Sequence, residues 1–263
     1  MTIFFPILKS NEIYQGSTIV HNFPPNNLQK VISKSRYLNL IWMDDNYWKT
    51  KLITKIKPLE SKEVFYDLVK PKGTNNDLLI MCITDEPLPP IMTSLPKYTV
   101  PTTTPLWRST VCINRDNSSA SYQGEIVAFP EKATLLSFIP FMQKKINVNN
   151  YLIFLNLESK PKKREGSLKF STVSQPKLII KDAEIKSNSC NLIDLNGLNI
   201  EDNEIIVCST KSMSGIPIFL SFSNEDSTMS LEHTHPIASF LIHCDRNNLQ
   251  RDIKANWFDL LNL

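Results

Sequence analysis

The sequence predicts an α+β fold dominated by β-strands. We expect an antiparallel β-sandwich or barrel-like body, preceded by a small mixed N-terminal region and followed by a C-terminal amphipathic helix. Short apolar or alternating segments recur from residue 106 onward, separated by turns rich in Asn, Asp, Ser, Pro or Lys, and this spacing is typical of a sandwich. At the end of the chain Leu249, Ile253, Trp257 and Leu260 recur at helical spacing behind a candidate cap, Asp245.

Residues 1–86 form the expected mixed region. The segment 26–35 predicts a short helix after a pair of prolines, with its apolar residues on one face. The apolar runs 37–43 and 77–84 and the partly alternating segment 48–57 predict strands. Residues 87–105 follow with six prolines, which favour extended backbone and supply few ladder donors, so we expect a linker or a surface strap.

Residues 106–263 form the expected β-rich domain, closed by a helix over 245–262. The predicted strands are 106–114, 125–129, 133–139, 151–157, 167–173, 177–186, 204–209, 216–223 and 228–233.

The amino-acid composition argues against several classes of function. Lysine and arginine number 29 against 26 acidic residues, and this dispersed net charge of +3 does not indicate a nucleic-acid or membrane partner. The chain has only 6 glycines and no glycine-rich phosphate-binding motif, which argues against a nucleotide cofactor. The 5 cysteines form no Cys-x-x-Cys pair, and Cys82, Cys112 and Cys208 lie in apolar, strand-like contexts, so we expect buried thiols in a soluble, cytoplasmic protein.

Three of the 4 histidines cluster near the C-terminus. If the segment around them is extended, His233 and His235 project from one face of a strand, where two imidazoles can share a zinc ion. Asp245 offers a third ligand, and Glu125 is a candidate for handling protons on a zinc-bound water. The competing interpretation is that these histidines are hydrogen-bonded residues at a strand end, beneath the final helix.

The run His-Thr-His-Pro that begins at His233, followed by Asp245, resembles the signature of JAMM-type metalloproteases, which cut isopeptide and peptide bonds with a zinc-bound water. The resemblance implies a zinc-dependent hydrolase. It covers the short stretch from His233 to Asp245 and departs from the family in two ways. The spacing between His235 and Asp245 is one residue shorter, and Ile242 occupies the position of a conserved serine.

Two further motifs have a structural and a functional interpretation. The segment around Ser214 resembles the sequence at the nucleophile of trypsin-like proteases, but His21 is the only histidine before it and lies far upstream, so a turn into a strand is the alternative. The basic run 160–164 is able to contact phosphate or an acidic partner through charge, or it forms a solvated loop.

The stretch 42–48 combines tryptophan, tyrosine and acidic residues. Trp42, Asp44, Asp45 and Trp48 suit recognition of a sugar or peptide, and they equally suit a hairpin that turns at Asp45 and Asn46. The absence of a cofactor motif and of a complete catalytic set favours a non-enzymatic binding module with a protein partner, acting as a subunit or accessory protein of a larger cytosolic assembly. A zinc-dependent hydrolase is the second hypothesis and a serine hydrolase at Ser214 the third, so the sequence leaves open whether the chain is an enzyme.

Overall fold

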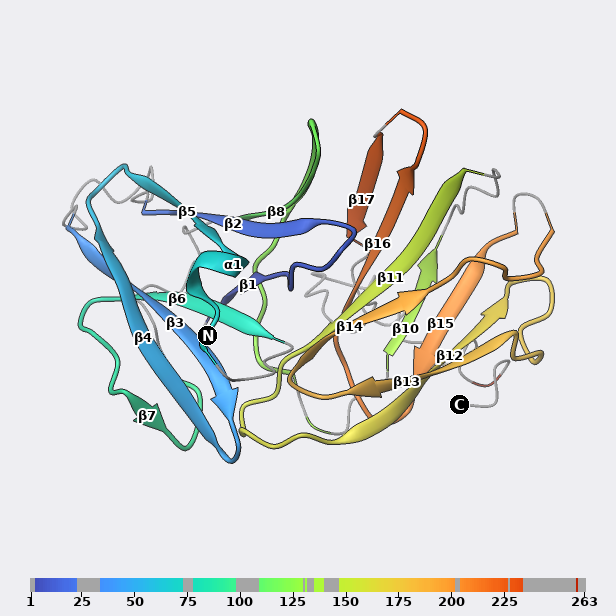
Figure 1. Cartoon of the computed structure of the whole chain (residues 1–263). Helices are drawn as coiled ribbons and strands as arrows, with labels where there is room; N and C mark the ends of the chain where they lie inside the picture. The colour runs from blue at the N-terminus through green and yellow to red at the C-terminus, as the bar shows by residue number, and fades with distance from the viewer. Residues whose placement is uncertain are drawn as a thin grey trace, which may run out of the picture. The chain divides into compact units, whose positions relative to one another are not determined.

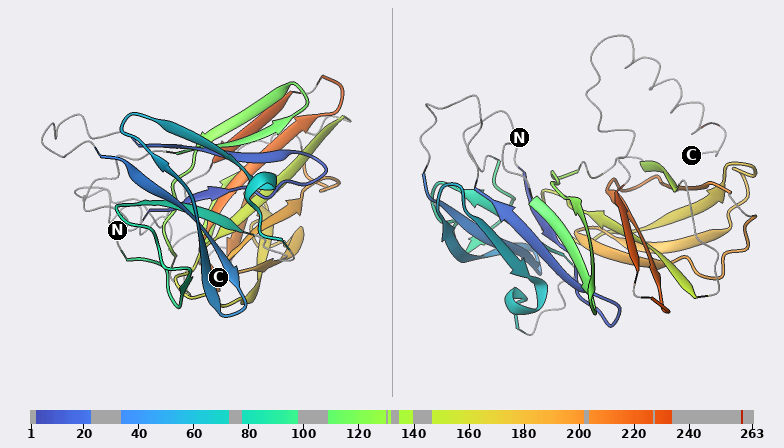
Figure 2. Two further views of the ribbon diagram at one scale, coloured as in Figure 1. Left: turned by 60° about the vertical axis from the view of Figure 1, so that its left-hand side comes forward. Right: turned by 90° about the horizontal axis from the view of Figure 1, so that it is seen from above.

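Figure 1 shows the computed structural model of the chain, which describes residues 3–22, 34–72, 78–97, 109–129, 131, 135–139, 147–201, 204–226, 228–233 and 259. The chain divides into two compact units. The first contains Met1–Ala128, Leu157–Lys162 and Asn188–Cys190, and the second contains Phe129–Asn156, Lys163–Ser187 and Asn191–Leu263. Each unit is built from two antiparallel sheets, and Figure 2 shows the strands from two further directions.

The first unit has a five-stranded sheet in the order β1-β6-β3-β4-β7. Its strands are β1 (Phe5–Ile7), β3 (Arg36–Asp44), β4 (Tyr47–Ile56), β6 (Leu79–Thr84) and β7 (Ile91–Met92). Every residue of the apolar strand β6 is buried. A continuous apolar run of this kind is what a strand covered on both faces requires.

The second sheet of this unit has the order β5-β2-β8-β9. Its strands are β2 (Gln15–His21), β5 (Ser61–Phe65), β8 (Ser109–Arg115) and β9 (Ser118–Gln123), and the four-residue helix α1 (Tyr66–Val69) follows β5. Leu38, Leu40 and Met81 of the first sheet share one buried cluster with Val20 and Val64 of the second. The unit is therefore a β-sandwich.

Strand β2 buries polar residues as well as the apolar Val20. Ser17 and Thr18 are fully buried, and each donates a hydroxyl hydrogen bond, Ser17 to Glu63 Oε1 at 2.8 Å and Thr18 to Pro6 O at 2.6 Å. At Gly16 an added Cβ would lie 1.9 Å from the carbonyl oxygen of Leu8. Only glycine allows this close approach of two backbones.

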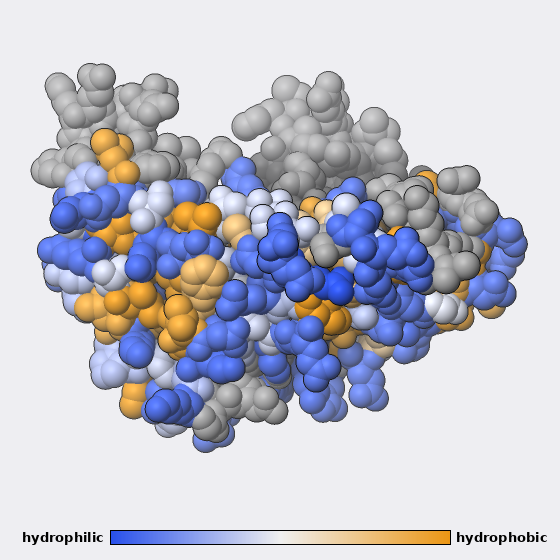
Figure 3. Space-filling model, turned by 45° about the horizontal axis from the view of Figure 1, so that its top comes forward, coloured by the Kyte–Doolittle hydropathy of each residue, from blue (hydrophilic) through white to orange (hydrophobic). Residues whose placement is uncertain are grey.

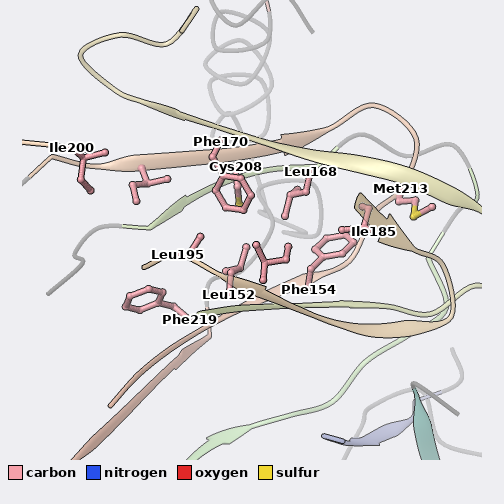
Figure 4. Close-up of a cluster of buried hydrophobic side chains, with 12 residues drawn as sticks. Leu152, Phe154, Leu168, Phe170, Ile185, Leu195, Ile200, Cys208, Met213 and Phe219 are labelled. Atoms are coloured by element: carbon pink, nitrogen blue, oxygen red, sulfur yellow. The ribbon is translucent and has the colours of Figure 1, made fainter. Parts of the chain in front are cut away.

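The second unit also consists of two sheets, in the orders β10-β15-β12-β13 and β14-β11-β16-β17. Their strands are β10 (Leu135–Ile139), β11 (Val148–Asn156), β12 (Glu165–Thr172), β13 (Lys181–Lys186), β14 (Ser189–Asp194), β15 (Ile206–Thr210), β16 (Ile216–Ser223) and β17 (Met229–His233). The first two residues of β14 are counted with the first unit and its other four with the second. In Figure 4, Phe170 and Cys208 from one sheet meet Leu152 and Phe154 from the other in a buried apolar core. This unit is a second β-sandwich.

The expected fold class is right in its main feature, since the described residues are dominated by antiparallel strands. The barrel-like alternative is wrong, because every described sheet ends in two edge strands and none closes on itself. The expected mixed N-terminal region is mostly strand, and its one described helix is α1. The expected helices over 26–35 and 245–262 lie outside the described residues, apart from residues 34 and 35, which are not helical, and Asp259, which is.

The segment 125–129 was expected to form a strand, but it holds only isolated bridge residues, Ile126, which pairs with Phe4, and Phe129. The proline-rich segment is described up to residue 97, and this part runs along β4. Thr50 donates its amide to Pro90 O at 3.0 Å and its hydroxyl to Pro89 O at 2.8 Å, and the short strand β7 pairs with β4 next to these contacts. The described part of the segment therefore lies as a strap on the edge of the sheet.

Candidate functional site

The end of the β3–β4 hairpin carries the best candidate for a binding surface. Asp45 adopts a left-handed φ of 51°, which an aspartate tolerates better than most residues, and the chain reverses within two residues. This tight turn sets the register, in which Asp44 lies opposite Tyr47 and Trp42 lies opposite Lys49. On the other side of β4, Lys49 lies opposite Ile91 of β7.

Directly opposed residues in an antiparallel sheet share a face, as do residues two apart on one strand. The register therefore places one set of side chains on a single face, which we call the hairpin patch: Trp42, Asp44, Tyr47, Lys49 and Ile91. Tyr47 is 48% exposed and Ile91 is 51% exposed, while the other three are partly buried. Figure 3 shows hydrophobic residues gathered in patches between hydrophilic ones on one face of the protein. Within the hairpin patch Trp42 also packs against the buried cluster that contains Leu40, which shares its face of β3, so the exposed part of the face is its end at Tyr47 and Ile91.

The other face of the hairpin belongs to the core. Trp48 lies opposite Met43, is only 1% exposed and donates its indole N–H to Ser159 O at 3.0 Å. Burial and a satisfied indole donor are typical of a core tryptophan. Of the four residues expected to bind a ligand here, Trp42 and Asp44 thus lie in the hairpin patch, Asp45 forms the turn, and Trp48 belongs to the core.

The loop that accepts the hydrogen bond from Trp48 is itself fixed by Asn188. The side chain of Asn188 accepts the amide of Glu158 at 2.7 Å and donates to Lys160 O at 2.9 Å and to Lys162 O at 3.1 Å. Ser159 O also accepts the amide of Leu95 at 3.2 Å. These bonds, all within the first unit, hold the turn end of the hairpin against this loop.

The expected zinc site falls largely outside the described residues. His235 and Asp245 lie outside them, and His233 is the last residue of β17, where its backbone pairs with Ile218. Among the residues that the structure describes, no three histidine, cysteine or acidic side chains are close enough to hold a metal ion. Zinc binding by His233, His235 and Asp245 stays a prediction.

Glu125, the expected proton-handling residue, has well-defined partners in the first unit. Its carboxylate accepts the amide of Ser109 at 3.1 Å and the side-chain amide of Gln123 at 2.9 Å. Burial lowers the pKa of His21 below its ordinary 6.5, and the negative charge of Glu125 partly opposes this shift. His21 Nδ1 lies 2.7 Å from Ser61 Oγ, a contact that cross-strand pairing of β2 with β5 produces.

Ser214 does not resemble an accessible nucleophile. The residue is 4% exposed in the connection between β15 and β16, and its carbonyl accepts the side-chain amide of Asn156 at 2.6 Å. Of the basic run, Lys160, Lys162 and Lys163 are exposed. Arg164 is partly buried and donates to the carbonyl oxygens of Ser212, at 3.2 Å, and of Glu131.

The four described cysteines are free thiols. Cys82, Cys112 and Cys208 are buried as expected, and burial raises the pKa of each; that of Cys208 rises to about 12. A thiol with so high a pKa is a poor nucleophile. No helix among the described residues is long and apolar enough to cross a membrane.

Sequence reasoning missed Tyr47, Lys49 and Ile91 as members of the hairpin patch. A two-residue turn at Asp45 and Asn46 fixes which residues of the two strands lie opposite each other. Tyr47 and Lys49 could therefore have been predicted from the register of the hairpin. Ile91 could not have been predicted in this way, because its position depends on the long-range pairing of β7 with β4. Comparisons of the chain with family models, with curated proteins and with solved structures found no match.

Proposed function

We propose that the chain is a non-enzymatic interaction module that binds a protein partner through the hairpin patch, as a subunit or accessory protein of a larger cytosolic assembly. The observation that carries the proposal is the shared face of Trp42, Tyr47 and Ile91, with Asp44 and Lys49 between them. Tryptophan and tyrosine are enriched in interface hot spots, where large rigid side chains are buried by the partner. The free, mostly buried cysteines suit a reducing compartment.

The hydrogen bonds that hold the hairpin in place support this proposal. Trp48 anchors the opposite face through its bond to Ser159, and the strap at Pro89 and Pro90 fixes the outer side of β4. Side chains that are held in place before binding lose little conformational entropy when a partner arrives. The carboxylate of Asp44 and the ammonium of Lys49 would set the orientation of the partner more than the affinity.

The test compares two substitutions on opposite faces of the hairpin. Ile91→Asp places a charge within the hairpin patch, and Leu52→Asp places one on the other face of β4, where Leu52 is 45% exposed and opposes Asn39. Each variant is used to capture partners from a native extract, and the captured proteins are quantified by mass spectrometry. We expect Ile91→Asp and Tyr47→Ala each to weaken capture of the specific partner by at least about tenfold, the scale of a hot-spot loss.

Leu52→Asp should leave that capture unchanged. Thermal unfolding of each variant checks that the fold is intact. Equal capture by the wild type and Ile91→Asp, or a loss confined to Leu52→Asp, would exclude the hairpin patch as the binding surface.

A further inference from the structure

The strand β9 forms an edge that lacks the usual protection against pairing. It ends the sheet β5-β2-β8-β9, and its sequence is Ser-Ser-Ala-Ser-Tyr-Gln. Among the edge strands of the four described sheets it is the longest without a charged residue or a proline. Natural proteins normally block such edges with lysine, proline or a bulge, because an open edge is a template for another strand.

The hydrogen-bonding pattern shows which backbone groups of β9 face outward. Gly124 donates its amide to Ser109 O at 3.2 Å, and β8 and β9 pair in a regular register with Val111 opposite Tyr122. In an antiparallel ladder, alternate residues bond to the neighbouring strand. Ser119 and Ser121 therefore direct their N–H and C=O groups away from β8, and no backbone partner lies on that side among the described residues.

We propose that this edge pairs with β9 of a second copy of the chain, antiparallel and about a two-fold axis at Ala120. In this register Ser119 of each copy opposes Ser121 of the other, and the two residues exchange backbone hydrogen bonds. Such an isologous contact is the commonest way to form a homodimer. It also fits the sheet, whose strands are already antiparallel.

The side chains of β9 are complementary to themselves in this register. On the exposed face, the small hydroxyl side chains of Ser119 and Ser121 meet without opposing like charges. On the inner face, Ala120 meets Ala120 of the partner subunit at the closest pair of the ladder, and Tyr122 meets the small Ser118 of the partner subunit. Because β9 carries no charge, it offers no electrostatic attraction to a strand from an acidic or a basic protein. The edge therefore favours a second copy of the chain as its partner.

The first experiment measures the mass of the full chain over a range of concentrations by sedimentation equilibrium. We expect a reversible dimer for the wild type. Ser121→Pro removes an outward N–H without breaking a bond to β8, and it should weaken the dimer at least tenfold. Ser121→Ala keeps the backbone edge and should dimerise like the wild type, while Ile91→Asp in the hairpin patch should not affect dimerisation.

The second experiment locates the axis by cross-linking. In the proposed register the two Ala120 Cα atoms lie about 4.5 Å apart, within the range that a disulfide spans. Oxidised Ala120→Cys should run as a covalent dimer on a non-reducing gel, whereas Ser118→Cys, Ser119→Cys and the wild type, which carries the native cysteines, should not. A wild type that stays monomeric, a Ser121→Pro variant that dimerises normally, or cross-linking at another position of β9 would overturn the proposal.

Discussion

His21 illustrates how single residues in this fold respond to their surroundings. Its imidazole is partly buried and contacts Ser61 of β5, and burial lowers its pKa below 6.5. At a pH between the pKa of His21 in the folded chain and its pKa in the unfolded chain, the unfolded chain binds more protons than the folded chain. The stabilisation at His21 is therefore fully present above pH 6.5 and is lost as the pH falls through the folded pKa.

The charge of Glu125 makes this behaviour testable. Because that charge raises the pKa of His21 against the effect of burial, Glu125→Gln should lower the pKa further. A titration of the imidazole resonances by NMR measures the shift, and Glu12→Gln, at an exposed site that does not influence His21, is the control. An unchanged or raised pKa in Glu125→Gln would show that the carboxylate does not act on His21.

Among the secondary-structure elements, the turn between β4 and β5 contains a residue, Leu59, that has a strained backbone conformation and an exposed side chain. Leu59 adopts a φ of 64° and is 69% exposed, and its amide donates to Asn22 O at 2.9 Å. Asn22 also bonds Ile56 O at 2.9 Å, so the turn is held in a conformation that leucine disfavours by roughly 1–2 kcal/mol. Asparagine tolerates this conformation much better.

Leu59→Asn should therefore raise the free energy of unfolding by roughly 0.5–1 kcal/mol, because it relieves strain and removes little buried surface. Urea unfolding followed by circular dichroism measures the change. Leu59→Ala keeps a side chain with the same backbone preference and should give little gain. An equal gain from both substitutions would point to the exposed apolar surface of leucine, rather than its backbone, as the source.

The strands that the sequence predicted differ in composition from the strands that it missed. The strands β3, β6, β11 and β16 are apolar runs whose side chains alone indicate burial. The strands β2, β5, β9 and β14 are rich in Ser, Thr, Lys or Asn, and they exist because a neighbouring strand supplies their backbone partners. Buried Ser17 and Thr18 show the reason, since their partners Glu63 and Pro6 are distant in sequence.

For the candidate site, sequence reasoning found the right hairpin but did not separate its faces. Trp42 and Trp48 look equivalent in the sequence, yet the register sends one to the hairpin patch and the other to Ser159, which lies 111 residues away. No local pattern identifies such a partner. Residue types therefore indicated the location, and long-range pairing decided which side chains are available for binding.

At the scale of the whole molecule, the chain enters the first unit three times. After residue 128 it returns with Leu157–Lys162 and again with Asn188–Cys190, so this unit is not one continuous stretch of sequence. The two returning segments supply the acceptor of the Trp48 indole and the side chain of Asn188. They also include Leu157, which is fully buried.

This connectivity predicts that residues 1–128 alone are much less stable than the same residues in the full chain. Without the segment that contains Ser159, the indole N–H of Trp48 loses its acceptor in the protein, and a hydrogen bond of this kind contributes roughly 0.5–1.5 kcal/mol. Loss of Leu157 exposes further apolar surface at that site. Urea unfolding of the fragment, followed by tryptophan fluorescence, should show a transition at lower denaturant than in the full chain. The full-length variant Asn188→Ala loosens only the loop and should lie between the two, whereas a fragment as stable as the full chain would mean that the returning segments do not hold the first unit together.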